Sequence, residues 1–424
     1  MGVVSSIASV ADTLQPQTLT FVASMGGALI DRMTAFDRLL QNTSFRCGVL
    51  ALLTLLVRIM GASGPYFADD LRHISAIESG KLVIHAPGYF LFNASGFVIS
   101  YLFHVSAANA LQILNITFSI SGAVVFYLLL TRLTAIRSPF LLSLAYTCSP
   151  IVWFSGDVHC SYASVTFFAP LLILVVEGER RFVWGCVIWA LMAGFRPSDG
   201  VFVLPWMVYH SVQFRWKDRL IGVAVAVPIS AAWWIPSVER YGHGLLSPFR
   251  GSGAEANKLA QGLLAGGFGL HAFVNAFHAV AGIIMTWGVL VPVLCLGATA
   301  WMRNRTARSM TIFLLPGLAF FLLYYVSDSP YFAYLAAAGM ILAGTYMEEW
   351  SAKWRHSIYA VAISTSVLFM LCARPAYKKT STARAVADAY FLKYSIPSIK
   401  EHKDPRLASL LGACDDSEVR GICK

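Results

Sequence analysis

The sequence predicts an all-α protein that crosses the membrane many times. Of its 424 residues, 57% are hydrophobic and only 13% are charged, whereas soluble domains carry about a quarter charged residues. Apolar stretches follow one another from Cys47 to Ala373, and a helix of about 20 such residues spans a bilayer. We therefore expect a polytopic membrane protein with about 11 transmembrane helices. The net charge of +10 is scattered over short loops, which argues against a nucleic-acid partner.

The chain begins with a mixed segment, residues 1–45, which we expect on the cytoplasmic side. Its weakly apolar stretch from Leu19 to Ile30 is too short to span and should lie on the membrane surface as an interfacial helix. The transmembrane domain follows over residues 46–373, and its first span starts at Cys47. That span contains Arg58, which must face protein or a polar cavity because a charge in lipid is costly.

The stretch from Gly88 to Val105 decides the sidedness of every later loop. If it lies along the surface as a juxtamembrane helix, twelve basic residues fall in cytoplasmic loops, as the positive-inside rule predicts. Counting it as a span would invert that bias. The later spans are then expected at 110–131, 138–155, 160–177, 181–195, 199–213, 219–237, 271–300, 309–327, 330–347 and 355–373.

This threading collects most of the acids and histidines on the non-cytoplasmic face. The first outer loop, 65–105, is the expected active-site loop, and a long glycine-rich loop, 238–270, is either a mobile lid or a slack connector. The polar tail, 374–424, should lie on the same face, where Cys414 and Cys423 can pair if the compartment is oxidising.

Two adjacent carboxylates, Asp69 and Asp70, open the first outer loop. Neighbouring acids repel each other, so that one of the two can serve as a base. The alternative is that both cap a short helix beginning at Leu71, since Asp is a favoured N-cap. His85 is likewise either a functional residue or a polar turn residue.

The motifs of the first half resemble the start of GT-C glycosyltransferases and are most similar to membrane protein O-mannosyltransferase-like families. The acidic pair is followed by His85-Ala-Pro-Gly-Tyr89, and Asn115 lies in an apolar helix that ends at Arg132. The likeness covers about residues 46–210. It continues through Ser149-Pro150-Ile-Val-Trp153, Tyr162 and Gly194-Phe-Arg196-Pro197.

This resemblance implies a GT-C-like fold and a hexosyl or related transferase that takes its sugar from a polyprenyl-phosphate donor. Asp70 or Asp69 matches the base that deprotonates a hydroxyl acceptor on a protein, glycan or lipid, with inversion in a single displacement. His85 would lie beside the donor phosphate, and Arg196 would stabilise the departing polyprenyl phosphate.

Further residues are implied as donor-phosphate or substrate-binding groups: His73, Asp157, His159 and Tyr162. His73 stands where relatives often have an acid, and Cys160 replaces the acid usually found two positions before the tyrosine. A divalent metal is a further possibility, for which the plausible ligands are Asp70, His85, Asp157 and His159.

Two other functions remain open. A transporter or flippase of lipid-linked sugars should hold its charged groups near the bilayer midplane, whereas here the acids cluster in loops. An inactive GT-C relative would retain the fold alone. The departures at His73 and Cys160 favour it, as does Ala86, which stands where the family motif commonly has a proline. The compact size favours a bacterial inner membrane, with the site facing the periplasm.

Overall fold

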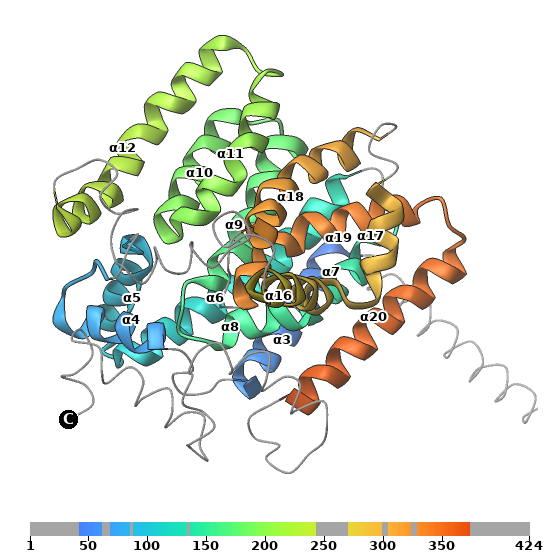
Figure 1. Ribbon diagram of the computed structural model, residues 1–424, viewed down its shortest axis with the longest axis horizontal. Helices are drawn as coiled ribbons and strands as arrows, with labels where there is room; N and C mark the ends of the chain where they lie inside the picture. Colours follow the sequence, from blue (N-terminus) through green and yellow to red (C-terminus); the bar gives the residue numbers. More distant parts are fainter. Residues whose placement is uncertain are drawn as a thin grey trace, which may run out of the picture. The chain divides into compact units, whose positions relative to one another are not determined.

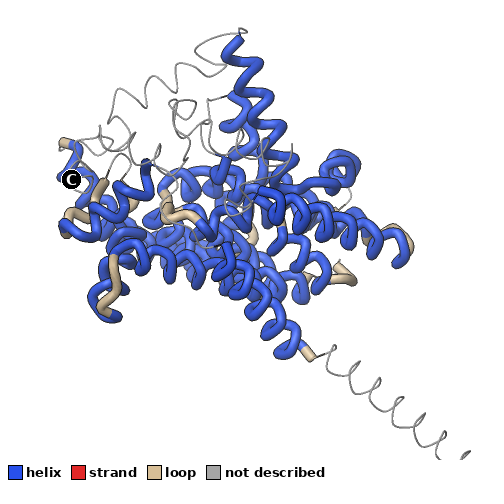
Figure 2. Tube along the Cα trace, turned by 90° about the horizontal axis from the view of Figure 1, so that it is seen from below, coloured by secondary structure: helices blue, strands red, loops and turns tan. Residues whose placement is uncertain are grey.

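The computed structural model describes residues 42–61, 68–84, 88–133, 136–242, 270–298, 304–323 and 329–373. Contacts divide the chain into two compact units, Met1–Val49 and Leu50–Lys424. Among the described residues every regular element is a helix and none is a strand (Figure 2). The expected interfacial helix in residues 1–45, most of loop 238–270 and the whole tail, 374–424, lie outside the described residues.

The helices coincide with the apolar segments of the sequence, which confirms the prediction of an all-α polytopic membrane protein. By length and composition, three helical segments of the described chain are able to cross a membrane: Ala107–Arg132, Trp216–Tyr241 and Ala279–Leu296. In chain order the α-helices are α3 (Thr43–Gly61), α4 (Ala68–Ser79), α5 (Phe90–Phe103), α6 (Ala107–Arg132), α7 (Pro139–Cys148), α8 (Pro150–Asp157), α9 (Tyr162–Ile173), α10 (Phe182–Phe195), α11 (Pro197–Ser211), α12 (Trp216–Tyr241), α16 (Leu270–Trp287), α17 (Val291–Ala298), α18 (Arg305–Leu323), α19 (Ala333–Met347) and α20 (Ala352–Ala373).

Helix α5 is short for a transmembrane helix. Its 14 residues measure about 21 Å, against roughly 30 Å for the hydrocarbon core, and α10 has the same length. Arg58, near the end of α3, donates to the carbonyl of Val152, and Gln112, near the start of α6, donates to that of Gly156. The end of α3 and the start of α6 therefore both contact α8, which agrees with a juxtamembrane α5. The number of spans stays a prediction.

Proline interrupts two of the apolar segments. Pro150 has no backbone N–H, so α7 stops at Cys148 and α8 starts afresh with Pro150 in its first turn. Pro170 lies inside α9, which continues into a π-helix, η1 (Leu174–Gly178). These breaks set the direction in which the residues at the ends of α8 and η1 point.

The helices pack through small residues and aromatic rings. Helix α6 lies against α9, α10 lies against α12, and α18 lies against α19 (Figure 1). Gly122 of α6 faces the backbone of Thr166 so closely that a Cβ atom there would collide with the carbonyl. Close approach through small residues is how helices associate in lipid, where burial of apolar area gives little driving force.

The basic loops that were expected to be cytoplasmic lie together at one end of the bundle. Ion pairs join Arg132 to Glu179 at 3.5 Å, and both Arg137 and Arg355 to Glu348 at 3.4 and 3.6 Å. The acidic residues of the candidate site lie at the other end, beside Arg58 and the α8–α9 turn. This arrangement agrees with the threading, whose orientation stays a prediction.

Candidate active site

The two carboxylates of the first outer loop have different surroundings. Helix α4 begins at Ala68, so Asp69 and Asp70 lie in its first turn, and the expectation of a helix that starts at Leu71 is wrong. Asp70 is fully buried and its Oδ1 accepts a hydrogen bond of 2.8 Å from Cys160 Sγ. Asp69 is 27% exposed and accepts a hydrogen bond from Arg72 at 2.6 Å. Of the pair, Asp70 is the one directed into the protein.

Asn115 holds the α8–α9 turn in place against Asp70. Its side-chain amide donates to the carbonyls of Val158, at 2.6 Å, and of Cys160, at 3.1 Å. A buried amide that satisfies two carbonyls of one turn fixes its conformation, because either carbonyl left without a partner would cost free energy. The thiol of Cys160 consequently points at the carboxyl of Asp70, so the departure at Cys160 places a weak donor on the candidate base.

Arg196 lies in an aromatic cage. It precedes Pro197 at the start of α11, and its guanidinium carbon is 4.4 Å from the ring centre of Tyr162 and 4.1 Å from that of Tyr331. The side chain is fully buried, and the nearest carboxylate oxygen is that of Asp199, 3.8 Å away. The charge of Arg196 is therefore enclosed by protein and does not lie at the lipid–water interface.

The guanidinium of Arg196 has an ion pair with Asp199, 3.8 Å from Nη1, but among the described residues its hydrogen-bond donors are not taken up. Within the part of the chain that the structure describes, Nε, Nη1 and Nη2 have no hydrogen-bond partner, although all three are buried. A buried charged donor without an acceptor is costly, and an arginine fork matches the oxygens of a phosphate. This side chain is thus prepared for an anion.

Tyr89 connects the acidic turn to the arginine. It enters α5 with a left-handed backbone, φ 51°, and its hydroxyl shares a hydrogen bond with that of Tyr331. Burial raises the pKa of Tyr89 well above its ordinary value, so the phenol remains protonated. Through Tyr331, whose ring lies against Arg196, the phenol of Tyr89 is joined to the arginine.

Asp157 is the last residue of α8, and His159 lies in the turn between α8 and α9. Asp157 Oδ1 is 3.7 Å from Arg58 Nη1, and Arg58 also donates to the carbonyls of Val152 and Trp153. Arg58 is fully buried, which confirms that it faces protein. His159 is buried, and among the described residues its Nδ1 has no hydrogen-bond partner.

His73 and His85 are the two remaining histidines of the predicted site. His73 is buried between α4 and α5, with Nδ1 2.6 Å from Asn93 Oδ1 and its ring edge-on to those of Tyr89 and Phe92. It therefore supports the segment that carries Tyr89. His85 lies outside the described residues.

A metal site is not formed by the described residues alone. The described ranges contain no group of three or more His, Cys, Asp or Glu side chains placed to hold an ion. The predicted set of Asp70, His85, Asp157 and His159 includes a residue beyond those ranges, and the carboxyl of Asp157 is paired with Arg58.

Two members of the cluster were missed by sequence reasoning. Tyr331 lies about 170 residues after Tyr162, and only its position at the opening of an apolar segment signals it. Asp199 lies in the first turn of α11, where an acidic residue is a common helix-capping group, and its carboxyl is buried beside Arg196. A polar contact between distant helices leaves no periodic trace in a sequence.

Solved structures of ArnT from Cupriavidus metallidurans are similar to this chain. ArnT bound to undecaprenyl phosphate has a TM-score of 0.58 at 15% sequence identity, covering 89% of this chain and 74% of ArnT. ArnT in the apo state has a TM-score of 0.53 at 16% identity, covering 95% and 75%. A scan against protein-family models and a search of the curated proteins found no match.

The likeness to ArnT, at this identity, concerns the fold and singles out no mannosyltransferase-like family. It covers most of this chain, 89% and 95% in the two comparisons. The chain therefore has the GT-C fold.

Proposed function

We propose that this protein is a membrane glycosyltransferase that moves a sugar from a polyprenyl-phosphate donor to a hydroxyl acceptor on a protein, glycan or lipid. The observation that carries the proposal is Arg196, a buried guanidinium with unused donors, caged by tyrosines near a buried carboxylate. The donor class is supported by ArnT, whose structure holds undecaprenyl phosphate.

Asp70 is the proposed base. Its carboxylate takes the proton of the acceptor hydroxyl, whose oxygen attacks the anomeric carbon as the bond from that carbon to the phosphate oxygen breaks. The polyprenyl phosphate leaves with the bonding electrons, and the configuration inverts in this single displacement. Arg196 stabilises the negative charge that develops on the phosphate, a form of electrostatic catalysis that is strongest in a water-poor site.

The surrounding residues support these two groups. Tyr162 and Tyr331 each place a ring against the guanidinium, and Tyr89 offers a protonated hydroxyl that bonds to Tyr331. His85 and His159 are proposed to contact the donor phosphate or the sugar. We assign Asp157 and His73 to positioning, since their described contacts are with Arg58 and with Asn93.

The site is proposed to face the non-cytoplasmic side, which in a bacterium is the periplasm. The basic loops gather at the opposite end of the bundle, and the positive-inside rule places such loops in the cytoplasm. A lipid-linked donor confines the reaction to a membrane surface, and the proposed base and phosphate-binding residue lie at one end of the bundle. That placement favours an enzyme over a transporter with charged groups at the midplane.

Arg196→Gln should weaken the binding of undecaprenyl phosphate by about 10- to 150-fold, because hydrogen bonds to charged groups contribute roughly 1.5–3 kcal/mol. Binding to the purified full chain in detergent micelles measures this effect, and turnover of a radiolabelled polyprenyl-phosphate sugar in membranes measures transfer. The exposed Arg240→Gln removes the same charge at the same expected face and should leave both values within about twofold. Equal affinity of wild type and Arg196→Gln would refute the proposed donor site.

Cys160→Ala should lower the transfer rate by about three- to tenfold and move the acid limb of the pH–rate profile to higher pH. The ionised carboxylate of Asp70 loses a hydrogen-bond donor, which favours its protonated form. Cys160→Ser keeps a hydroxyl donor of similar size and should restore the wild-type profile. A Ser variant that behaves like the Ala variant would show that the thiol acts only by packing.

A further inference from the structure

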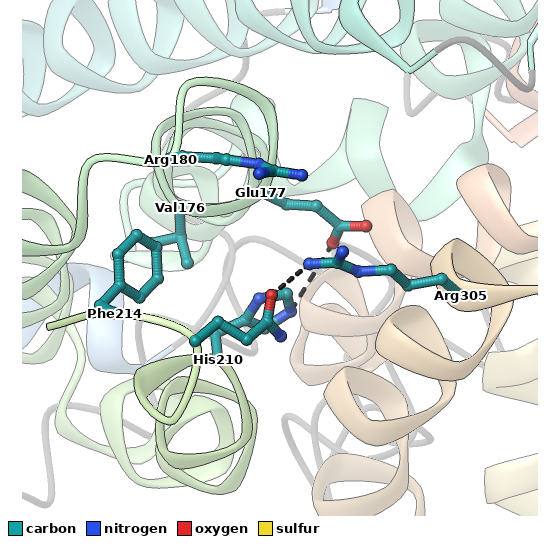
Figure 3. Close-up of a pocket in the computed structure, with 7 residues that line it drawn as sticks. Val176, Glu177, Arg180, His210, Phe214 and Arg305 are labelled. Carbon is teal, nitrogen blue, oxygen red and sulfur yellow. Dashed lines mark hydrogen bonds and ion pairs between the residues drawn. The ribbon is translucent and has the colours of Figure 1, made fainter.

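A second pocket lies at the end of the bundle opposite the candidate active site. It has a volume of about 290 Å³ and opens between η1, the end of α11 and the start of α18 (Figure 3). Pockets for whole small molecules are usually larger than about 300 Å³, so this one suits a compact group. Its lining residues are Val176, Glu177, Arg180, His210, Gln213, Phe214 and Arg305.

The floor of this pocket is a fixed polar network. Ser309 donates to Glu177 Oε2 at 2.7 Å, and its hydroxyl accepts a hydrogen bond from Trp206 Nε1 at 2.8 Å. His210 Nε2 lies 2.8 Å from the same hydroxyl and 3.8 Å from Glu177 Oε2. The carboxylate of Glu177 is thus engaged by the protein.

The local backbone brings Glu177 and Arg180 to the pocket. Glu177 belongs to the π-helix η1, a conformation that occurs mostly as single turns and often at functional sites. Arg180 follows it with φ 54°, in the left-handed region that residues other than glycine seldom adopt. The π-helix turn and the left-handed backbone of Arg180 together place the Arg180 side chain over the cavity.

Two arginines meet at the mouth of the pocket. The side chain of Arg180 reaches over it from the turn after η1, and Arg305 enters it from α18 (Figure 3). Arg305 donates to the side chain of Gln213, and the described part of the chain gives Arg180 no ion pair or hydrogen bond. Two guanidinium groups over one engaged carboxylate leave the pocket with net positive charge.

The segment that lines the pocket with Gln213 and Phe214 exposes apolar side chains next to charged ones. Val212 and Trp216 are 66% and 64% exposed, and Arg215 and Lys217 beside them are exposed as well. Basic pockets between transmembrane helices at the cytoplasmic surface are suited to lipid headgroups, whose acyl chains need an apolar path beside the charged site. A soluble phosphate has no acyl chain and would gain nothing from apolar contacts beside the charged site.

We propose that this pocket binds the phosphate of an anionic phospholipid from the leaflet opposite the candidate active site. Arg180 and Arg305 hold the phosphate oxygens, and Gln213 and Glu177 face the polar remainder of the headgroup. Phe214, with the exposed Val212 and Trp216 beside it, receives the start of an acyl chain.

The test measures association of spin-labelled phosphatidylglycerol with the full-length protein in phosphatidylcholine vesicles. The variant Arg180→Gln/Arg305→Gln should lower the association constant by about tenfold or more, since it removes two charge-assisted contacts. Arg181→Gln/Arg308→Gln is the matched control, because it makes the same charge change in the same two segments at exposed positions that do not line the pocket. The control should stay within about twofold of the wild type.

Two results would overturn the proposal. An equal loss in both double variants would show that diffuse surface charge attracts the lipid. The second result is that phosphatidylglycerol associates no better than phosphatidylcholine. If inorganic phosphate then binds to the wild type and the Arg180→Gln change weakens that binding, the pocket is a site for soluble phosphate instead. Neither readout depends on sugar transfer, so failure here is separate from failure of the glycosyltransferase assignment.

Discussion

Asp70→Asn should lower sugar transfer by about 10²- to 10⁴-fold, the usual contribution of a general base. The change removes the charge and keeps the shape, so Cys160 can still donate to the side-chain oxygen at position 70 and the turn should remain folded. Asp69→Asn should cost less than about tenfold, because Asp69 is partly exposed and its described hydrogen bond is to Arg72. The structure therefore separates two acids that the sequence alone presents as equivalent.

The measurement is transfer of radiolabel from a polyprenyl-phosphate sugar in membranes that contain equal amounts of each variant. Retention on size-exclusion chromatography in detergent shows that the Asn variants remain folded. Unchanged transfer in both variants would remove the base from the acidic pair, and a loss confined to Asp69→Asn would reverse the assignment.

Arg58→Leu should lower the free energy of unfolding by about 3–5 kcal/mol, the usual cost of breaking a buried ion pair on one side. The guanidinium is fully buried, donates to the carbonyls of Val152 and Trp153 and lies 3.7 Å from Asp157. Removing it leaves two carbonyls and a carboxylate without their cation at the junction of α3 and α8. The loss should appear as an earlier midpoint when the purified protein is titrated with a denaturing detergent.

Two variants make the Arg58 experiment specific. Arg132→Gln removes an arginine that is 64% exposed, and its ion pair with Glu179 should contribute no more than about 1 kcal/mol. Arg58→Leu combined with Asp157→Asn also removes the negative charge of the Asp157 carboxylate and should recover part of the stability. An Arg58→Leu midpoint equal to that of Arg132→Gln would contradict the buried role.

Much of the architecture follows from the sequence because a bilayer imposes local rules. Each span needs a continuous apolar stretch, and basic loops collect on one side. Helix positions and the sorting of loops can therefore be predicted from the order of residues in the chain, without knowledge of contacts between distant segments. The demotion of Gly88–Val105 to a surface helix needed only the count of basic residues in later loops, and α5 agrees with it. The acidic pair and Arg196 were also found this way, since charged residues at span ends are conspicuous.

The partners of those residues were decided by tertiary structure. Cys160 looks like the loss of an acid in the sequence, yet it donates to Asp70, 90 positions away. Tyr331 stacks on an arginine 135 positions earlier, and the pocket at the opposite end joins η1, α11 and α18. Such contacts depend on how each helix is rotated about its axis and on where Pro150 and Pro170 interrupt the helices.

What the sequence by itself determined is thus the all-helical membrane fold, the apolar segments that form its helices and the charged residues that make up the candidate site. What only the tertiary structure decided is which acid is buried, which arginine is left with unused donors and which loops enclose a second cavity. The physical reason is that hydrophobic transfer acts on each segment separately, whereas hydrogen bonds and ion pairs require two side chains from distant segments to meet within about 3–4 Å.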